Sequence, residues 1–224
     1  MIVANWKMNT PTEGVLNYVD SLKSDDVIIL PPAVYLNKLS DRYNNIGIQS
    51  ISSCQDGART GEISAKMASD FGCQYALIGH SERRHYWKES ESHLVQQCEQ
   101  AIEHQLTVIY CVGENLKEKL SGQTQQVIQQ QLLPFAPFFS DKFIVAYEPV
   151  WAIGGSEPAT IEDVEKTHTL IKHQTASTDL KVLYGGSVTT DNAHVFLDNP
   201  VVDGLLIGRA SLSSSSINQI IQSC

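Results

Sequence analysis

Lys7, His80 and Glu148 each follow a short apolar run, at points where the sequence changes from apolar to polar. Their side chains supply different chemistry: an ammonium group attracts an anion, a neutral imidazole donates a hydrogen bond, and a carboxylate takes up a proton. Gathered in one site, they would suit an enzyme that moves a proton on a small anionic substrate. Each of the three also has a plainer interpretation.

Glu148 ends the apolar segment Phe143–Tyr147 and precedes Pro149. Burial disfavours the charged form of a carboxylate, so we expect these neighbours to raise the pKa of Glu148, as suits a general base. The alternative is a buried glutamate that forms an ion pair with Arg83 or Arg84. This segment alone leaves both interpretations open.

His80 lies just after the run Tyr75–Ile78 and just before a turn. Backbone N–H groups of that turn would point at the ring and favour a neutral imidazole, whereas a purely structural histidine is the alternative. Lys7, beside Trp6, is either a solvated surface lysine or the local cation that an acidic protein needs to bind an anion. The formal net charge of −9 makes that need concrete.

Glycines follow two further apolar runs, at Gly185-Gly186-Ser187 and Gly208-Arg209. Glycine lets backbone N–H groups approach a ligand closely, and a short helix starting near Ala210-Ser211 would add its positive end. Both segments are candidates for a phosphate site, although the first two glycines could simply end a strand. The stretch Ala152–Ala159 combines glycines, small residues and a proline, which fits either a closing lid or an ordinary connection.

Eight compact runs of apolar and β-branched residues predict buried parallel strands. They are Ile2–Trp6, Val27–Leu30, Ile46–Gln49, Tyr75–Ile78, Thr107–Val112, Phe143–Tyr147, Lys181–Tyr184 and Gly204–Ile207. Segments of helical period separate them, including one that Thr160–Asp163 opens as a capping box, one that begins at Thr190–Ala193, and a final one at Ser216–Ile221. The second and third runs are close together, so the helix between them must be short.

Eight such repeats in 224 residues predict a (β/α)8 barrel. An open doubly wound sheet is disfavoured because it usually has fewer strands and because no G-x-G-x-x-G follows the first run. The loops after the carboxyl ends of barrel strands meet at one mouth, so Asn5, Lys7, His80, Glu148 and both glycine segments should converge there. No linker or composition break divides the sequence, and we interpret residues 1–224 as a single catalytic domain.

Composition excludes several classes of function. The acidic chain has no basic tract, which argues against nucleic acid as a partner. No apolar run approaches the roughly 18 residues of a membrane span, and the N-terminus does not resemble a signal peptide, so we expect no membrane partner. Five scattered cysteines without a CxxC pair or zinc-ligand spacing indicate reduced thiols, no metal site and a cytoplasmic location.

Seven motifs resemble the triosephosphate isomerase family, in the same order and along essentially the whole chain. They are Asn5-Trp6-Lys7-Met8-Asn9, Thr60-Gly61-Glu62-Ile63-Ser64, Ile78-Gly79-His80-Ser81-Glu82-Arg83-Arg84, Cys111-Val112-Gly113-Glu114, Ala146-Tyr147-Glu148-Pro149-Val150-Trp151-Ala152-Ile153-Gly154, Tyr184-Gly185-Gly186-Ser187-Val188 and Gly208-Arg209-Ala210-Ser211-Leu212. The His80 and Glu148 motifs are highly specific, because a chance occurrence of both in a barrel pattern is negligible.

The resemblance implies an isomerase of glycolysis and gluconeogenesis that interconverts dihydroxyacetone phosphate and D-glyceraldehyde 3-phosphate through an enediolate. Glu148 would transfer the proton between neighbouring carbons, while neutral His80, Lys7 and Asn5 would stabilise the enediolate oxygens. No metal or organic cofactor would be needed.

The resemblance also implies how the substrate is held. The phosphate would be bound by backbone N–H groups of Gly154, Ser187, Gly208 and Arg209, and a lid at Ile153-Gly154 would close over it. Glu82 and Cys111 would support the site. The loop carrying Thr60 would insert into a partner subunit, which implies a homodimer.

Several positions depart from the family pattern. Arg59 stands where an aromatic residue is common, Ser50 replaces a common asparagine, and Arg209 replaces the second of two glycines. The lid tip reads Gly155-Ser156-Glu157-Pro158. Two rivals remain. One is a different phosphate-binding barrel, which would have no reason to carry His80 and Glu148 in these contexts. The other is a barrel that has lost catalysis and acts as a binding or scaffold protein, against which the intact Lys7, His80 and Glu148 speak.

Overall fold

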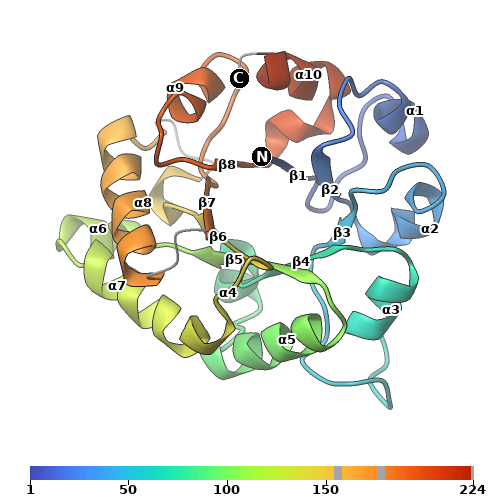
Figure 1. Ribbon diagram of the computed structural model, residues 1–224, viewed down its shortest axis with the longest axis horizontal. Helices are drawn as coiled ribbons and strands as arrows, with labels where there is room; N and C mark the ends of the chain where they lie inside the picture. Colours follow the sequence, from blue (N-terminus) through green and yellow to red (C-terminus); the bar gives the residue numbers. More distant parts are fainter. Residues whose placement is uncertain (154–157, 176–179, 223–224) are drawn as a thin grey trace.

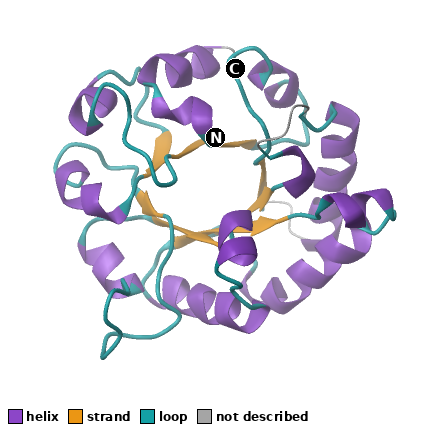
Figure 2. Ribbon diagram, turned by 180° about the vertical axis from the view of Figure 1, so that it is seen from behind, coloured by secondary structure: helices purple, strands orange, loops and turns teal. Residues whose placement is uncertain are grey.

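The computed structural model describes residues 1–153, 158–175 and 180–222. Within them the chain forms eight parallel strands arranged as a nearly closed barrel with helices around it (Figure 2). The strands are β1 (Ile2–Asn5), β2 (Val27–Leu30), β3 (Gly47–Ile48), β4 (Tyr75–Ile78), β5 (Thr107–Val112), β6 (Phe143–Tyr147), β7 (Lys181–Tyr184) and β8 (Gly204–Ile207). Six runs match the predicted strands residue for residue, whereas β1 is shorter by one residue and β3 by two.

The strands follow the order β2-β1-β8-β7-β6-β5-β4-β3. The remaining seam, between β2 and β3, is closed by an isolated parallel bridge between Ile29 and Ile46. The predicted (β/α)8 barrel is therefore confirmed, and β1 lies between β2 and β8 as barrel closure requires.

Helices connect the strands on the outside of the barrel (Figure 1). The α-helices are α1 (Val15–Asp20), α2 (Leu36–Leu39), α3 (Ala65–Asp70), α4 (Ser81–Tyr86), α5 (Glu91–Glu103), α6 (Leu116–Leu120), α7 (Thr124–Leu132), α8 (Ile161–Thr175), α9 (Ala193–Leu197) and α10 (Ser214–Gln222). In the part of the chain that the structure describes, four 3-10 helices accompany them: η1 (Ala33–Tyr35), η2 (Leu133–Phe138), η3 (Val150–Ala152) and η4 (Arg209–Leu212).

The predicted helix starts are close to the observed ones. The Thr160 hydroxyl accepts a hydrogen bond from the N–H of Asp163 at 3.2 Å, which caps α8. The helix between β2 and β3 is abbreviated to the four residues of α2, as expected. The last helix begins at Ser214, two residues before its predicted start.

Alternation along the strands divides the apolar residues into two layers. In β1, Ile2 and Ala4 face the surrounding helices, whereas Val3 faces the barrel interior. The interior layer consists of Val3, Ile28, Leu30, Leu77, Ile109, Cys111, Ile144, Ala146, Leu183 and Leu206. The barrel is therefore filled by side chains and is not a pore, so a ligand can enter only at its ends.

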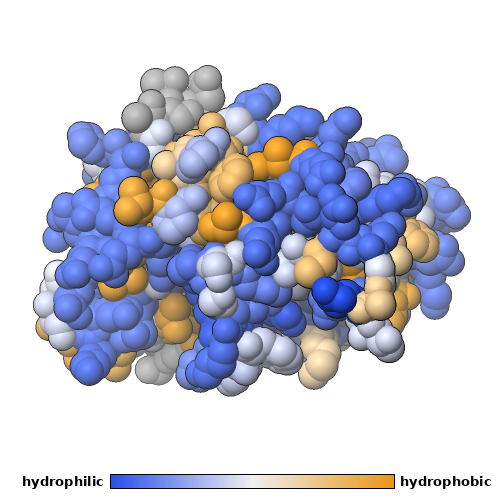
Figure 3. Space-filling view, turned by 90° about the horizontal axis from the view of Figure 1, so that it is seen from below, coloured by the Kyte–Doolittle hydropathy of each residue, from blue (hydrophilic) through white to orange (hydrophobic). Residues whose placement is uncertain are grey.

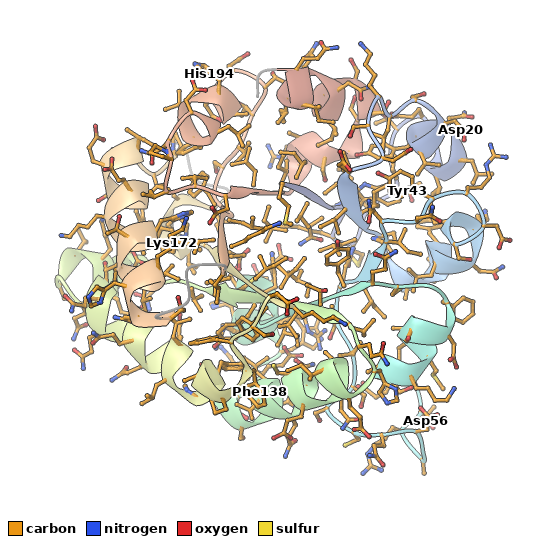
Figure 4. The ribbon with its side chains drawn as sticks, in the orientation of Figure 1. Asp20, Tyr43, Asp56, Phe138, Lys172 and His194 are labelled. Atoms are coloured by element: carbon orange, nitrogen blue, oxygen red, sulfur yellow. The ribbon has the colours of Figure 1, made fainter. Side chains whose placement is uncertain are left out.

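The face drawn in Figure 3 is mainly hydrophilic, with hydrophobic side chains gathered in small separate patches. One loop, which includes Asp56, projects away from the barrel beyond α3 (Figure 4). Among the described residues, no helix combines the length and apolar character that a membrane crossing requires. Cys54, Cys73, Cys98 and Cys111 are free thiols, as the sequence predicted for these four.

Candidate active site

A cavity of about 760 Å³ opens at the carboxyl ends of the strands. Eight residues that the sequence assigned to one site line it: Asn5, Lys7, His80, Glu82, Glu148, Ser187, Gly208 and Arg209. The predicted convergence at one mouth is therefore present in the structure. Gly154 lies outside the described residues, and Thr60 is exposed away from this cavity.

His80 and Glu148 form the centre of the site. The Nε2 atom of His80 lies 3.0 Å from Oε1 of Glu148, and the N–H of Ser81 donates to Oε2 of Glu148 at 2.8 Å. His80 caps the N-terminus of α4, where the N–H of Glu82 donates to its Nδ1 at 3.2 Å. Since Nδ1 accepts, the proton of a neutral ring is on Nε2, which donates to Glu148.

The pKa of Glu148 differs from the expectation. Burial of the carboxylate, which is 3% exposed, raises its pKa and is the largest single influence, as predicted. His80, the N–H of Ser81 and, less strongly, Lys7 favour the charged form, and together they lower the pKa below its ordinary value. The predicted raised pKa is therefore wrong for this arrangement. The residues next to Glu148 in the sequence are apolar, but the fold brings its carboxylate into contact with two polar groups from another part of the chain.

Among the described residues, Glu148 forms no ion pair with Arg83 or Arg84, the alternative that its segment left open. Arg83 pairs with Glu89, and Arg84 pairs with Glu91 while also donating to the backbone oxygen of Gly79. Both guanidinium groups are thus engaged with other partners, and neither lines the cavity. Glu148 has His80 as its nearest charged or chargeable partner.

Lys7 is held in the cavity by an unusual backbone. Its φ of 51° lies in the left-handed region, which residues other than glycine seldom adopt. The Nε2 of Gln49 donates to its carbonyl oxygen at 2.8 Å, and its own N–H donates to Oδ1 of Asn5 at 3.0 Å. Its Nζ lies 2.8 Å from Oε1 of Glu82. Lys7 is therefore a positioned cation and not a freely solvated one.

The glycine segments leave room for neighbouring side chains in the mouth of the barrel. A Cβ atom on Gly185 would lie 3.0 Å from Cγ of Glu148, and one on Gly208 would lie 3.4 Å from Cε of Lys7. Gly185 therefore does more than end a strand, because it makes room for the carboxylate. The hydroxyl of Ser187 donates to the carbonyl oxygen of Ala152 at 2.7 Å, which ties the loop after β7 to the loop after β6.

Arg209, which replaces a glycine of the family pattern, has an ordinary backbone conformation. It lies outside the positive-φ region and starts η4, with Gly208 as the preceding residue. Its side chain is exposed at the edge of the cavity.

Cys111 lies beneath Glu148 in the barrel interior. Burial raises the pKa of its thiol well above the ordinary value, and the charge and hydrogen bonding of Glu148 raise it further. The thiol is thus neutral and acts as a packed neighbour of the carboxylate, in line with a supporting role.

Sequence reasoning gave no role to Glu114, although this residue ends a quoted motif. It is fully buried, and its carboxylate accepts hydrogen bonds from the hydroxyl of Tyr147 and, at 2.9 Å, from Nε1 of Trp151. Gln49 and Ser81 were also missed. A carboxylate in an otherwise apolar context was the available signal for Glu114, whereas the roles of Gln49 and Ser81 depend on contacts between segments far apart in the chain.

Comparisons with known proteins agree with this site. A family model described as "Triosephosphate isomerase" matches residues 1–224. Relatives described as triosephosphate isomerase include one from Legionella pneumophila (strain Paris), 36% identical over 99% of this chain and 97% of its own, and one from Marinobacter nauticus, 37% identical over 100% and 96%. The crystal structure of triosephosphate isomerase from Bartonella henselae superposes with a TM-score of 0.89 at 33% identity, covering 99% of this chain and 97% of that one.

Proposed function

The chain belongs to the triosephosphate isomerase family, and from that premise we propose that Glu148 is the base with which it interconverts dihydroxyacetone phosphate and D-glyceraldehyde 3-phosphate. This is the isomerisation that serves glycolysis and gluconeogenesis. The observation that carries the assignment is the 3.0 Å contact between Glu148 and His80 in a cavity that Lys7 also lines.

Glu148 takes a proton from the carbon beside the substrate carbonyl and returns it to the neighbouring carbon. To reach that carbon, the carboxylate must turn away from the Nε2–H of His80 and the N–H of Ser81. These two donors lower its pKa in the present arrangement. Once they are lost, burial remains as the main influence and raises the pKa, so the carboxylate becomes a stronger base as it meets the substrate.

The two N–H groups that Glu148 leaves can then donate hydrogen bonds to the substrate. The Nε2–H of His80 can donate to a substrate oxygen that becomes negative in the enediolate, and Lys7 supplies a positive charge close by. Because Oδ1 of Asn5 accepts from the N–H of Lys7, the amide nitrogen is the end that Asn5 can offer. Glu82 keeps both His80 and Lys7 in position, through its backbone N–H and its carboxylate respectively.

The phosphate group belongs at Ser187, Gly208 and Arg209, where backbone N–H groups can approach it closely. Gly154, the fourth expected donor, lies outside the described residues. We include the expected closure of the connection at Ile153-Gly154, which would exclude water and protect the intermediate from losing phosphate. No step calls for a metal or an organic cofactor.

We further propose a homodimer in the cytoplasm, with residues 1–224 as one catalytic domain. Large apolar side chains are exposed near the mouth, among them Met8 at 94%, Tyr86 and Trp87. A second copy whose Thr60 loop covers them would remove this surface from water. On dilution, sedimentation should show dissociation together with loss of activity, and a fully active monomer at micromolar concentration would refute the dimer.

The experiment for the function itself is a coupled assay of glyceraldehyde 3-phosphate formation, run beside NMR of dihydroxyacetone phosphate in D2O. We expect rapid turnover and incorporation of deuterium at the carbons between which the proton moves. A chain that binds the substrate but neither isomerises it nor exchanges its proton would be the non-catalytic barrel.

A further inference from the structure

One side chain of α6 contacts both ends of the connection between β6 and α8. The Nζ of Lys119 lies 5.0 Å from the ring centroid of Trp151, which follows β6 in η3. The same nitrogen lies 2.5 Å from Oδ1 of Asp163, in the first turn of α8. In Figure 1, α6 and α8 lie side by side at the edge of the barrel, which brings these three residues together.

The indole of Trp151 is held from two directions. Its Nε1–H edge donates to the buried carboxylate of Glu114 at 2.9 Å, and its face receives the ammonium group of Lys119. Both residues belong to the β5–α6 part of the chain. Because a cation within about 6 Å of an aromatic face is attracted to it, Lys119 restrains the ring where a hydrogen bond at the edge alone would let it tilt.

Trp151 is close to the proposed base in the sequence. It follows Glu148 by three residues and belongs to η3, whose Ala152 carbonyl accepts the hydroxyl of Ser187. That hydrogen bond holds η3 from the side of β7, and Trp151 holds it from the side of β5 and α6. A shift of the indole would therefore pull on η3, which begins two residues after Glu148.

The position of Asp163 is fixed by the start of α8. Its backbone N–H bonds to the Thr160 hydroxyl that caps α8, and its carbonyl oxygen accepts the hydroxyl of Thr167. The carboxylate is thus fixed to the helix start. Because the side chains of Lys119 and Asp163 are about 30% exposed, at 28% and 31%, their ion pair adds little stability, and its importance lies in where it holds the ammonium group.

We propose that Lys119 is a positioning residue for the isomerisation: it acts through Trp151 on the placement of Glu148, while Asp163 keeps its ammonium over the indole. This rests on the proposed role of Glu148 as the base. A displacement of well under 1 Å at a reacting group is enough to slow proton transfer, whereas the expected phosphate donors Gly208 and Arg209 follow β8 and do not belong to this segment, so binding of the phosphate changes less. Lys119 touches no substrate atom and is not itself catalytic.

The test compares Lys119→Met, which keeps the alkyl chain and removes the charge, with Lys117→Met. Lys117 is an exposed lysine of the same helix, so the control removes the same charge from α6 without touching Trp151. We expect Lys119→Met to lower kcat about tenfold with KM changed less than about twofold, and Lys117→Met to leave both unchanged. Lys119→Arg should restore kcat to within about threefold, because a guanidinium also binds carboxylate and aromatic faces.

A double-mutant cycle with Trp151→Leu, which removes the aromatic face, identifies the route of the effect. If Lys119 acts through the indole, its replacement should cost clearly less in the Trp151→Leu background than in the original chain. An equal loss in both backgrounds, no recovery with arginine, or a kcat for Lys119→Met equal to that of Lys117→Met would each overturn the proposal. If Lys119→Met does not fold, Asp163→Asn replaces it, with an expected loss in kcat of about threefold.

The activity of the parent chain in the same assay distinguishes the proposed function from the proposed role of Lys119. A parent chain that does not isomerise dihydroxyacetone phosphate would refute the proposed function, whatever the variants do. A fully active parent with an equally active Lys119→Met variant would refute only the role of Lys119.

Discussion

Two buried histidines of this barrel have opposite surroundings. His80 lines the cavity, accepts a backbone N–H at Nδ1 and faces the Glu148 carboxylate with Nε2. His168 lies in α8 against the barrel wall, where Nδ1 is 3.3 Å from the carbonyl oxygen of Val201. Among the described residues, no partner reaches Nε2 of His168. The two rings are equally hidden from water, yet only His80 has an ionisable partner and an opening beside it.

The comparison shows that burial alone does not identify a reactive group. Around His168, burial lowers the pKa to about 4, so the ring is neutral at physiological pH and serves as packing against Tyr147. Around His80, specific donors and acceptors fix the tautomer and direct a proton toward a site that a ligand can enter. Four substitutions, ordered by expected size, test this contrast, and His80→Phe is added as the counterpart of His168→Phe.

Replacing Glu148 by Gln should have the largest effect. The variant has no proton acceptor, so kcat should fall at least about a thousandfold, equivalent to about 4 kcal/mol of transition-state stabilisation. Binding of a phosphate-bearing inhibitor should be largely retained. Steady-state kinetics measures the first quantity and inhibition the second; a near-normal kcat would remove Glu148 from the role of base.

Replacing His168 by Phe tests the other histidine. In the parent chain the unfolded state binds a proton near pH 6.5 and the folded state only near pH 4, so stability is lost as pH falls through this window. By pH 4.5 the loss is about 3 kcal/mol, and the variant should lack this part of the pH dependence. Urea unfolding at pH 7 and 4.5, at one protein concentration, measures the difference.

Activity at pH 7 provides the matched control for this pair. His168→Phe should leave kcat nearly unchanged, whereas His80→Phe should reduce it about a hundredfold or more. If the two variants lost similar activity, the distinction between a packed and a reactive histidine would not hold.

Replacing Lys7 by Ala should weaken binding of glycerol phosphate, which carries the phosphate but no carbonyl group. We expect a Kd about thirtyfold higher, or about 2 kcal/mol, because the variant loses a positioned cation in an acidic protein. Lys23→Ala is the control, since Lys23 is an exposed lysine at the opposite end of the barrel. Titration calorimetry measures the Kd of both variants for glycerol phosphate. Equal Kd values would make Lys7 an ordinary surface residue.

Replacing Arg209 by Gly should have the smallest effect. The exposed guanidinium contributes little, and the backbone N–H at this position remains, so kcat/KM should change less than about tenfold, or under about 1.4 kcal/mol. A loss as large as that of Lys7→Ala would mean that the guanidinium itself binds phosphate.

The fold was largely predictable because each strand is a compact apolar run with a helical segment after it. The shortest strand, β3, was overestimated, since its ends are set by pairing with neighbours and not by its own residues. Within the site, the convergence of Lys7, His80 and Glu148 followed from strand ends alone. Topology brings such residues together whatever their detailed contacts.

The lowered pKa of Glu148 was not predictable from its own segment. The decisive donors, His80 and the N–H of Ser81, lie almost 70 residues away in sequence and meet the carboxylate only in the folded barrel. The left-handed backbone of Lys7 is similar, because it depends on Gln49 and Asn5 holding it from either side. Local sequence shows which groups are present, and tertiary contacts decide how strongly each proton is held.

The seam between β2 and β3 has a consequence for how the barrel opens. A ring that is joined at one place by a single bridge, between Ile29 and Ile46, can become an open sheet there without breaking any other ladder. The N–H of Ile29 donates across this seam to the carbonyl oxygen of Asn45, so it reports the opening directly. In native-state hydrogen exchange, this amide should exchange faster than those of β5, which is paired along its length on both sides. The barrel would then open first between β2 and β3, on the side away from β6 and Glu148.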